Sequence, residues 1–165
     1  MARVYLSIGG NQGDREKNLA EVCKHISSRI GIIRKQSAIY ESEPWGFECN
    51  SNFLNQVVMV ESGLTPAALM LEISYIESLM GRERKNAGYS SRTMDIDVLF
   101  YEQAILLTPE LIVPHKHLHK RRFVLEPLNE IAPNLIHPLF SLTVHDLLVT
   151  CTDKSKAWKY EPVTA

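Results

Sequence analysis

The chain has 165 residues, 45% of them hydrophobic and 22% charged, and its formal net charge is −1. This length predicts a single domain spanning residues 1–165, and the near-neutral charge disfavours a protein that binds nucleic acid through overall basicity. The three cysteines show no CxxC spacing, which disfavours a disulfide framework or a zinc ribbon and fits a reducing cytoplasm. We find no apolar stretch that predicts a signal peptide or a membrane-spanning helix.

Hydrophobic periodicity divides the chain up to Tyr101 into strands and helices. Asp14 is expected to cap the first helix, and Thr65, followed by Pro66, the second. In order, we expect a strand at 3–8, a helix ending at Gly31, strands at 32–41 and 53–61, a helix ending at Gly81 and a strand at 93–101. This βαββαβ order predicts an α+β fold with a ferredoxin-like core, in which an antiparallel sheet carries both helices on one face. We therefore expect the other face to be open to ligands and loops.

A glycine-rich turn from Gly9 to Asp14 joins the first expected strand to the first expected helix. Such a turn can bind phosphate at the N-terminus of the helix. The GK[ST] ending of a P-loop is missing, however, so we interpret the turn as a structural hinge.

Two aspartates, Asp95 and Asp97, interrupt the apolar strand expected at 93–101. The apolar residues of this strand are expected together on one face: Met94, Ile96, Val98 and Phe100. Both carboxylates then lie on the opposite face, with their Cα atoms roughly 6.6 Å apart. Aspartate is depleted in strands, and two neighbouring carboxylates repel each other unless a cation lies between them. Magnesium, which binds carboxylate oxygens and substrate phosphates, suits this arrangement.

Cationic side chains precede the acidic strand, at Arg82, Arg84, Lys85 and Arg92. Their glycine- and serine-rich surroundings predict a surface loop, and guanidinium groups donate two hydrogen bonds at once to phosphate oxygens. Together the acids and the arginines predict an enzyme that transfers a phosphoryl-type group from a metal–nucleotide. The alternative is an edge strand with a solvated acidic face beside a charged loop.

Phe53 and Asn55 share one face of the third expected strand. A ring face and an amide suit a flat heterocycle with hydrogen-bonding edges, but they equally suit a core phenylalanine and an asparagine satisfied by the backbone. The preceding segment, 42–52, places Trp45 and Phe47 among polar residues. It predicts a loop that exposes aromatic rings for stacking, or a hairpin connection whose rings pack on the domain.

Beyond Tyr101 we expect additions to the core: a short hairpin at 105–107 and helices at 123–131 and 142–149. Residues 152–165 are expected to form a weakly ordered tail.

Three histidines, His115, His117 and His119, alternate in the basic segment 113–123. Alternating histidines on a strand could bind zinc. The preceding proline and the surrounding positive charge favour instead a loop that contacts phosphate.

Four motifs occur in order along the chain: LSIGGNQGD, FLNQVV, RTMDIDVLFY and VPHKHLHKRRFVLEPLNEIAP. Together they resemble the 6-hydroxymethyl-7,8-dihydropterin pyrophosphokinase family over about residues 4–149. The resemblance implies a ferredoxin-like fold and, in folate biosynthesis, diphosphate transfer from ATP to 6-hydroxymethyl-7,8-dihydropterin, which yields AMP and the pterin diphosphate. We therefore expect small-molecule substrates, no nucleic-acid or membrane partner, and a cytoplasmic monomer.

The same resemblance implies roles for individual residues. Asp95 and Asp97 would hold two magnesium ions on the ATP phosphates, and Arg82 and Arg92 would act as catalytic arginines. The implied ATP-site positions are Glu77, Arg84, Tyr89, Arg92, His115 and Arg121. The implied pterin-site positions are Ser42, Trp45, Gly46, Phe53, Asn55 and Phe123, with the two phenylalanines on either side of the ring.

Two rival functions stay open at this point. An RNA-binding module can have the same topology and present aromatic residues on its sheet, although the expected RNP1 pattern is missing. A zinc hydrolase could be built on His115, His117 and His119.

Overall fold

The fold is taken from a computed structural model that describes residues 1–44, 51–81, 83–84, 90–91 and 93–162. At 83–84 and 90–91 only the backbone is described. Within these residues, no helix has both the length and the apolar content needed to span a bilayer.

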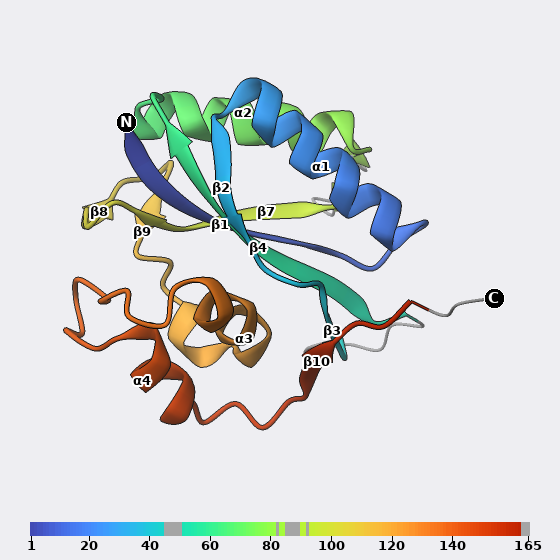
Figure 1. Ribbon diagram of the computed structural model, residues 1–165. Helices are drawn as coiled ribbons and strands as arrows, with labels where there is room; N and C mark the ends of the chain where they lie inside the picture. The colour runs from blue at the N-terminus through green and yellow to red at the C-terminus, as the bar shows by residue number, and fades with distance from the viewer. Residues whose placement is uncertain (45–50, 82, 85–89, 92, 163–165) are drawn as a thin grey trace.

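An antiparallel sheet forms the centre of the domain (Figure 1). Strand β1 (Ala2–Gly10) lies inside the sheet and pairs on one side with β4 (Phe53–Ser62) and on the other with β7 (Asp95–Tyr101). The far side of β4 pairs with two short strands, β2 (Ile32–Gln36) and β3 (Tyr40–Ser42). This order of strands confirms the ferredoxin-like core predicted from the sequence.

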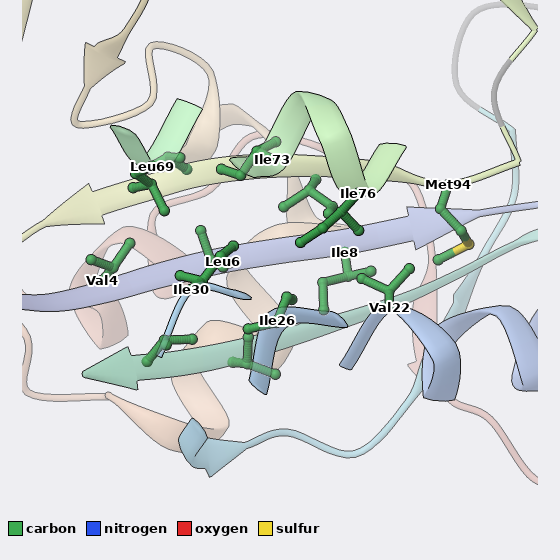
Figure 2. Close-up of a cluster of buried hydrophobic side chains, with 14 of the residues drawn as sticks. Val4, Leu6, Ile8, Val22, Ile26, Ile30, Leu69, Ile73, Ile76 and Met94 are labelled. Atoms are coloured by element: carbon green, nitrogen blue, oxygen red, sulfur yellow. The ribbon is translucent and has the colours of Figure 1, made fainter. Parts of the chain in front are cut away.

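Helices α1 (Arg15–Arg29) and α2 (Pro66–Leu79) cover one face of the sheet (Figure 1). Both predicted caps are present, because Asp14 accepts a hydrogen bond from Lys17 N and Thr65 accepts one from Ala68 N. The apolar stripes of the two helices pack on alternate residues of the strands beneath them (Figure 2). This core includes Leu6 and Ile8 of β1, Val22 and Ile26 of α1, and Ile73 and Ile76 of α2.

A second core lies on the opposite face, under α3 (Arg122–Ile131) and α4 (Val144–Val149). The expectation that this whole face is open to ligands is therefore wrong. Tyr5, Val57 and Met59 point into this core from the sheet, and Leu125, Leu128 and Leu147 close it from the two helices. The C-terminal helices thus leave only one end of the face for a site.

The strand expected at 32–41 is interrupted. Ser37, between β2 and β3, exchanges hydrogen bonds with Val57: its N–H donates to Val57 O at 2.9 Å, and its Oγ accepts from Val57 N at 3.0 Å. The side chain therefore takes the place of a regular backbone pair. As a result, β3 is a separate three-residue strand.

Phe100 lies on the other face from the one predicted. Leu6 pairs with Val98 and Tyr5 with Phe100, so Leu99 is an extra residue in β7. Such a bulge shifts the alternation by one position. Phe100 consequently packs edge-on against Tyr5 in the second core, with ring centroids 6.1 Å apart. The carbonyl of Leu99 accepts a hydrogen bond from His115 N at 3.0 Å.

The expectation of a weakly ordered tail over 152–165 needs correction. Residues Ala157–Lys159 form β10, which pairs antiparallel with β3, and Tyr160 N donates to Ile39 O at 2.8 Å. Asp153 accepts a hydrogen bond from Arg122 N, at the start of α3. The segment therefore returns across α3 and adds a strand to the sheet.

The remaining elements are short and local. They are the β5 (Glu83–Arg84) and β6 (Ser90–Ser91) pair, a hairpin formed by β8 (Leu106–Leu107) and β9 (Ile112–Val113), and one turn of 3₁₀ helix, η1 (Leu118–Lys120). The hairpin differs from the one expected after the turn at Glu102, because Leu106 and Leu107 pair with the later strand β9.

Candidate active site

A hollow opens on the sheet face beside the second core, where β1 carries two small residues. Ser7 lies between Val57 and Asp97 in the strand register, and Gly9 lies between Asn55 and Asp95. Because residues directly opposite one another in a sheet point to the same side, all of these side chains face the same way. Small residues on the central strand flanked by larger ones leave a depression in the sheet.

This depression is the sheet pocket, a cavity of about 240 Å³. Strands β1, β3, β4 and β7 form its floor, and the residues at the start of α3 form one wall. Its lining residues are Ser7, Gly9, Ser42, Glu43, Phe53, Asn55, Asp95, Asp97, Arg121 and Phe123. Seven of these were expected at the site, so the structure brings together residues spread from position 42 to position 123.

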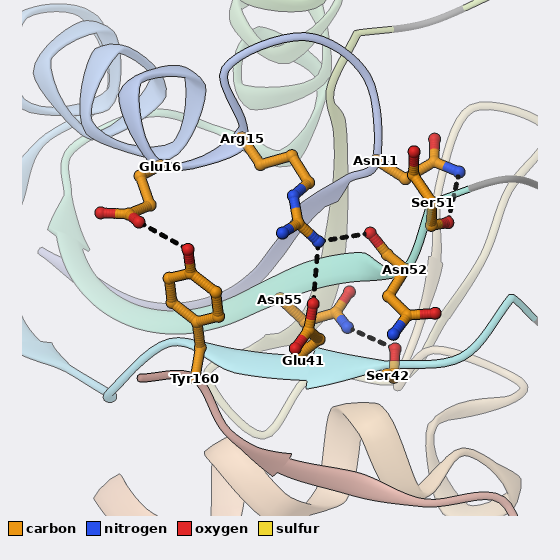
Figure 3. A network of polar contacts seen from close by, with 9 residues as sticks. All are labelled: Asn11, Arg15, Glu16, Glu41, Ser42, Ser51, Asn52, Asn55 and Tyr160. Atoms are coloured by element: carbon orange, nitrogen blue, oxygen red, sulfur yellow. Dashed lines mark hydrogen bonds and ion pairs between the residues drawn. The ribbon is translucent and has the colours of Figure 1, made fainter. Parts of the chain in front are cut away.

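Asn55 is buried in the sheet pocket with a defined orientation. Its Nδ2 donates to Ser42 Oγ at 2.8 Å, which fixes which way the amide faces (Figure 3). A Cβ atom at Gly9 would lie 2.5 Å from Asn55 Oδ1, closer than real Cβ contacts allow. The absence of a side chain at Gly9 therefore makes room for this amide.

Two aromatic rings and one guanidinium group stand around the amide. Phe53 and Phe123 are both half-buried and line the sheet pocket from β4 and from α3. The Arg121 guanidinium lies 5.7 Å from the centre of the Phe123 ring. Ring faces beside a fixed amide suit a planar heterocycle with polar edges.

Asp95 and Asp97 lie on the same face of β7, as predicted, and both line the sheet pocket. Both are half-buried. Their carboxylate oxygens are the donors that hard cations such as magnesium prefer, so this pair fits a magnesium site. Across the described residues, no group of three or more His, Cys, Asp or Glu side chains is placed to hold a metal ion. Magnesium here would need further ligands from water or from a substrate.

A second cavity, the edge cavity, adjoins the outer side of β7 and also measures about 240 Å³. Its wall is largely apolar, with Met70 from α2 and Leu111 and Ile112 around β9. The complete lining is Met70, Ile96, Asp97, Val98, Pro109, Glu110, Leu111, Ile112, His115 and Lys116. Asp97 therefore lines both cavities, whereas Asp95 lines the sheet pocket.

His115 is neutral at physiological pH. Burial, followed by the positive charge of Arg121, lowers the pKa of His115 to about 4. Its Nδ1 accepts a hydrogen bond from His117 N at 3.1 Å, so the remaining proton is on Nε2. The residue can therefore donate one hydrogen bond to a ligand in the edge cavity.

Glu77 lies behind the acidic strand. Its buried carboxylate accepts a hydrogen bond from Ile96 N at 3.0 Å, between the two aspartates. The contact joins α2 to the part of β7 that carries the two aspartates.

The three histidines do not form a zinc site. His115 and His117 precede η1 and His119 lies within it, so strand alternation does not apply there. The His115 and His117 rings are 6.0 Å apart, whereas His119 packs on Phe140 with ring centroids 4.8 Å apart. The zinc-hydrolase alternative is not supported. The RNA-binding alternative also fails, because helices and carboxylates occupy the sheet face that such a module would use.

Several expected site residues lie outside the described part of the chain: Trp45, Gly46, Arg82, Tyr89 and Arg92. For Arg84 only the backbone is described, in β5. Conversely, Ser7, Gly9 and Glu43 line the sheet pocket and were missed as site residues. The two small residues could have been found from their place on the central strand beside the acidic one.

Comparison with known proteins agrees with the geometry. Residues 5–133 match the family model "7,8-dihydro-6-hydroxymethylpterin-pyrophosphokinase (HPPK)". The 2-amino-4-hydroxy-6-hydroxymethyldihydropteridine pyrophosphokinase of Aquifex aeolicus is 41% identical over 140 residues, covering 85% of this chain and 86% of that protein. The Bacillus subtilis protein of the same name is 37% identical, covering 77% of this chain and 76% of its own length.

Solved structures show the same fold. A crystal structure of Plasmodium falciparum HPPK-DHPS superposes with a TM-score of 0.72 at 17% identity. The match covers 90% of this chain but only 44% of that longer chain. With the family model spanning most of the sequence and relatives near 40% identity, the chain belongs to the 7,8-dihydro-6-hydroxymethylpterin-pyrophosphokinase family.

Proposed function

We propose that the reaction of this pyrophosphokinase takes place at the junction of the two cavities. The enzyme transfers diphosphate from ATP to 6-hydroxymethyl-7,8-dihydropterin, a step in folate biosynthesis that yields AMP and the pterin diphosphate. In our assignment the pterin occupies the sheet pocket and ATP the edge cavity. The observation that supports this most strongly is that Asp97 lines both cavities.

The sheet pocket has the chemistry needed to bind a pterin. Phe53 and Phe123 supply ring faces for a flat heterocycle, and Asn55 supplies an oriented amide for its hydrogen-bonding edge. Ser42 holds that amide through its hydroxyl group. By resemblance to the family, Trp45 and Gly46 would complete the pocket.

The edge cavity suits a nucleotide in two ways. Apolar residues such as Leu111 and Ile112 offer contacts for a base, and the neutral His115 offers a hydrogen-bond donor. Arg121 borders the sheet pocket near the acidic pair, where it can approach a phosphate. By resemblance, Glu77, Arg84, Tyr89 and Arg92 would add further contacts to ATP. The hydrogen bond that Glu77 accepts from Ile96 N also holds β7 in place.

Asp95 and Asp97 would hold two magnesium ions between the substrates. When bound, magnesium neutralises phosphate charge and makes the substrate hydroxyl a better nucleophile. The residues of the chain then act by positioning: the sheet pocket orients the hydroxymethyl group, and the edge cavity orients the triphosphate. Arg82 and Arg92 would stabilise charge on the transferring phosphates.

We further propose that the enzyme acts on small molecules as a cytoplasmic monomer, without a nucleic-acid partner. The near-neutral net charge of −1 speaks against a nucleic-acid partner, and the free thiols of Cys23 and Cys151 fit a reducing cytoplasm. The monomer is proposed from the resemblance to the family alone.

The products of the reaction provide the test. The purified chain is incubated with magnesium, ATP and 6-hydroxymethyl-7,8-dihydropterin, and the nucleotides are separated by chromatography. We expect AMP in equal amount to the pterin diphosphate. Formation of ADP, or of AMP without the pterin product, would contradict the assignment.

A further inference from the structure

We propose that Arg15 is a positioning residue for the pterin, acting on the sheet pocket from the opposite face of the sheet. This inference rests on the proposed function, because it assumes that the sheet pocket holds the pterin. It also gives a role to the glycine-rich turn between β1 and α1, which the sequence alone presents as a hinge.

Arg15, the first residue of α1, reaches two places that are distant in sequence (Figure 3). Its Nη1 donates to Glu41 Oε2 at 3.0 Å and to Asn52 O at 2.8 Å. The Arg15 and Glu41 side chains are only 25% and 19% exposed, so solvent screens their ion pair incompletely. One guanidinium group therefore joins β3 to the residue just before β4.

Each residue bound by Arg15 directly precedes a residue that lines the sheet pocket. Glu41 precedes Ser42, and Asn52 precedes Phe53. Successive side chains of a strand point to opposite faces, so Glu41 meets α1 while Ser42 faces the pocket. Ser42 in turn holds the Asn55 amide, at 2.8 Å. A shift at Arg15 would thus displace both the Phe53 ring and the Asn55 amide.

β3 needs such support because it is only three residues long. A second contact from the same turn, Asn11 Nδ2 to Ser51 O at 3.3 Å, ties down the chain just before Asn52. Tyr160, which follows β10, lies under the Arg15 guanidinium at 5.7 Å and donates its hydroxyl proton to Glu16 at 2.7 Å. The contacts of Asn11 and Tyr160 therefore stabilise the same edge of the sheet as Arg15 does (Figure 3).

The effect should be selective for the pterin. The order of strands is β10, β3, β4, β1 and β7, so Arg15 acts at the β3 side while the acidic strand and the edge cavity lie beyond β1. A loss of Arg15 should therefore change pterin binding and leave the nucleotide site in place.

The test compares Arg15→Met with Arg29→Met, a matched change at the other end of α1. Arg29 also makes an ion pair across elements, to Glu72 of α2 at 2.6 Å, and neither residue lines either cavity. For Arg15→Met we expect the Kd of 6-hydroxymethyl-7,8-dihydropterin to rise about tenfold, and that of a non-hydrolysable ATP analogue with magnesium to stay within about twofold. For Arg29→Met both constants should stay within about twofold of the parent enzyme.

Arg15→Lys and Glu41→Gln keep the test informative if Arg15→Met does not fold. Each retains part of the contact, so each should raise the pterin Kd by less than Arg15→Met does, about threefold. The inference is overturned if these variants bind the pterin like the parent, if Arg29→Met weakens it equally, or if both substrates lose affinity together. Asn55→Ala separates the two proposals: if this variant binds the pterin normally, the sheet pocket itself is misassigned.

Discussion

Gly9 shows how a single hydrogen atom in place of a side chain shapes the site. A methyl group at this position would come within 2.5 Å of Asn55 Oδ1 and displace the amide that we assign to pterin recognition. We expect Gly9→Ala to raise the Kd of the pterin about tenfold or more, because a misplaced polar group loses its hydrogen bonds to the ligand. Calorimetric titration with the pterin and with magnesium and an ATP analogue would measure both affinities.

Gly63→Ala is the matched control for that experiment. A Cβ at Gly63 would meet only Met1 Sδ, at 4.0 Å, which is an ordinary contact. If the two alanine variants bind the pterin equally well, Gly9 does not act through Asn55.

Buried histidines should make the stability of the protein depend on pH. Burial lowers the pKa of His137, whose Nδ1 accepts hydrogen bonds from the Leu139 and Phe140 N–H groups, and the pKa of His115 falls to about 4. The unfolded chain, with ordinary histidines of pKa about 6.5, therefore takes up protons first as the pH falls. The stabilising effect is present in full above about pH 6.5 and is lost toward pH 4.

Urea unfolding between about pH 7.5 and 5 measures this dependence. We expect His115→Gln to show a shallower fall in the free energy of unfolding than the parent, because glutamine does not titrate. Parallel curves for the two proteins would show that His115 is not held neutral by the fold.

Among the elements, β10 falls in the segment that the sequence predicted to be a weakly ordered tail. Its three residues pair with β3, and Tyr160 adds hydrogen bonds to Ile39 O and to Glu16. A chain ending at Lys156 would lose all of these contacts. At about 0.5–1.5 kcal/mol for each net hydrogen bond, we expect a loss of roughly 2 kcal/mol and a fall in Tm of about 4–8 °C.

Thermal unfolding by circular dichroism would measure this change, with a chain ending at Glu161 as the control because it retains β10 and Tyr160. The shorter chain should also bind the pterin more weakly, since β10 flanks the strand that carries Ser42. Equal Tm values for the two truncations would mean that the pairing contributes nothing to stability.

For the whole molecule, periodicity predicted the core under α1 and α2 and the shared face of Asp95 and Asp97, whereas most of the other expected site residues came from the resemblance to the family. The helical spacing in α1 and α2 is a strong signal, because each of these helices buries one apolar stripe. The alternation in β1, β4 and β7 places one set of residues under these helices, but the opposite faces of the same strands contribute to the second core. The two aspartates on one face of a strand were an equally strong signal of a metal site, because neighbouring carboxylates repel each other unless a cation lies between them. Residues from positions 42 to 123 meet around them in one cavity.

What the sequence missed depends on contacts between distant segments. The bulge at Leu99 is set by pairing with β1, and the strand formed by Ala157–Lys159 is set by the free edge of β3. Helices α3 and α4 cover part of one face of the sheet, and this placement depends on the path of the chain after β9. Neither residue propensity nor local periodicity records such placements.

We propose that Asp95 and Asp97 hold the magnesium on which the reaction depends. The most direct test measures AMP formation against magnesium concentration for the parent enzyme and for Asp97→Asn, which keeps the shape of the side chain and removes its charge. We expect a strictly magnesium-dependent parent and a fall in kcat of at least about 100-fold in the variant, at every magnesium concentration. An Asp97→Asn enzyme that turns over at the parental rate, with the same dependence on magnesium, would contradict the account.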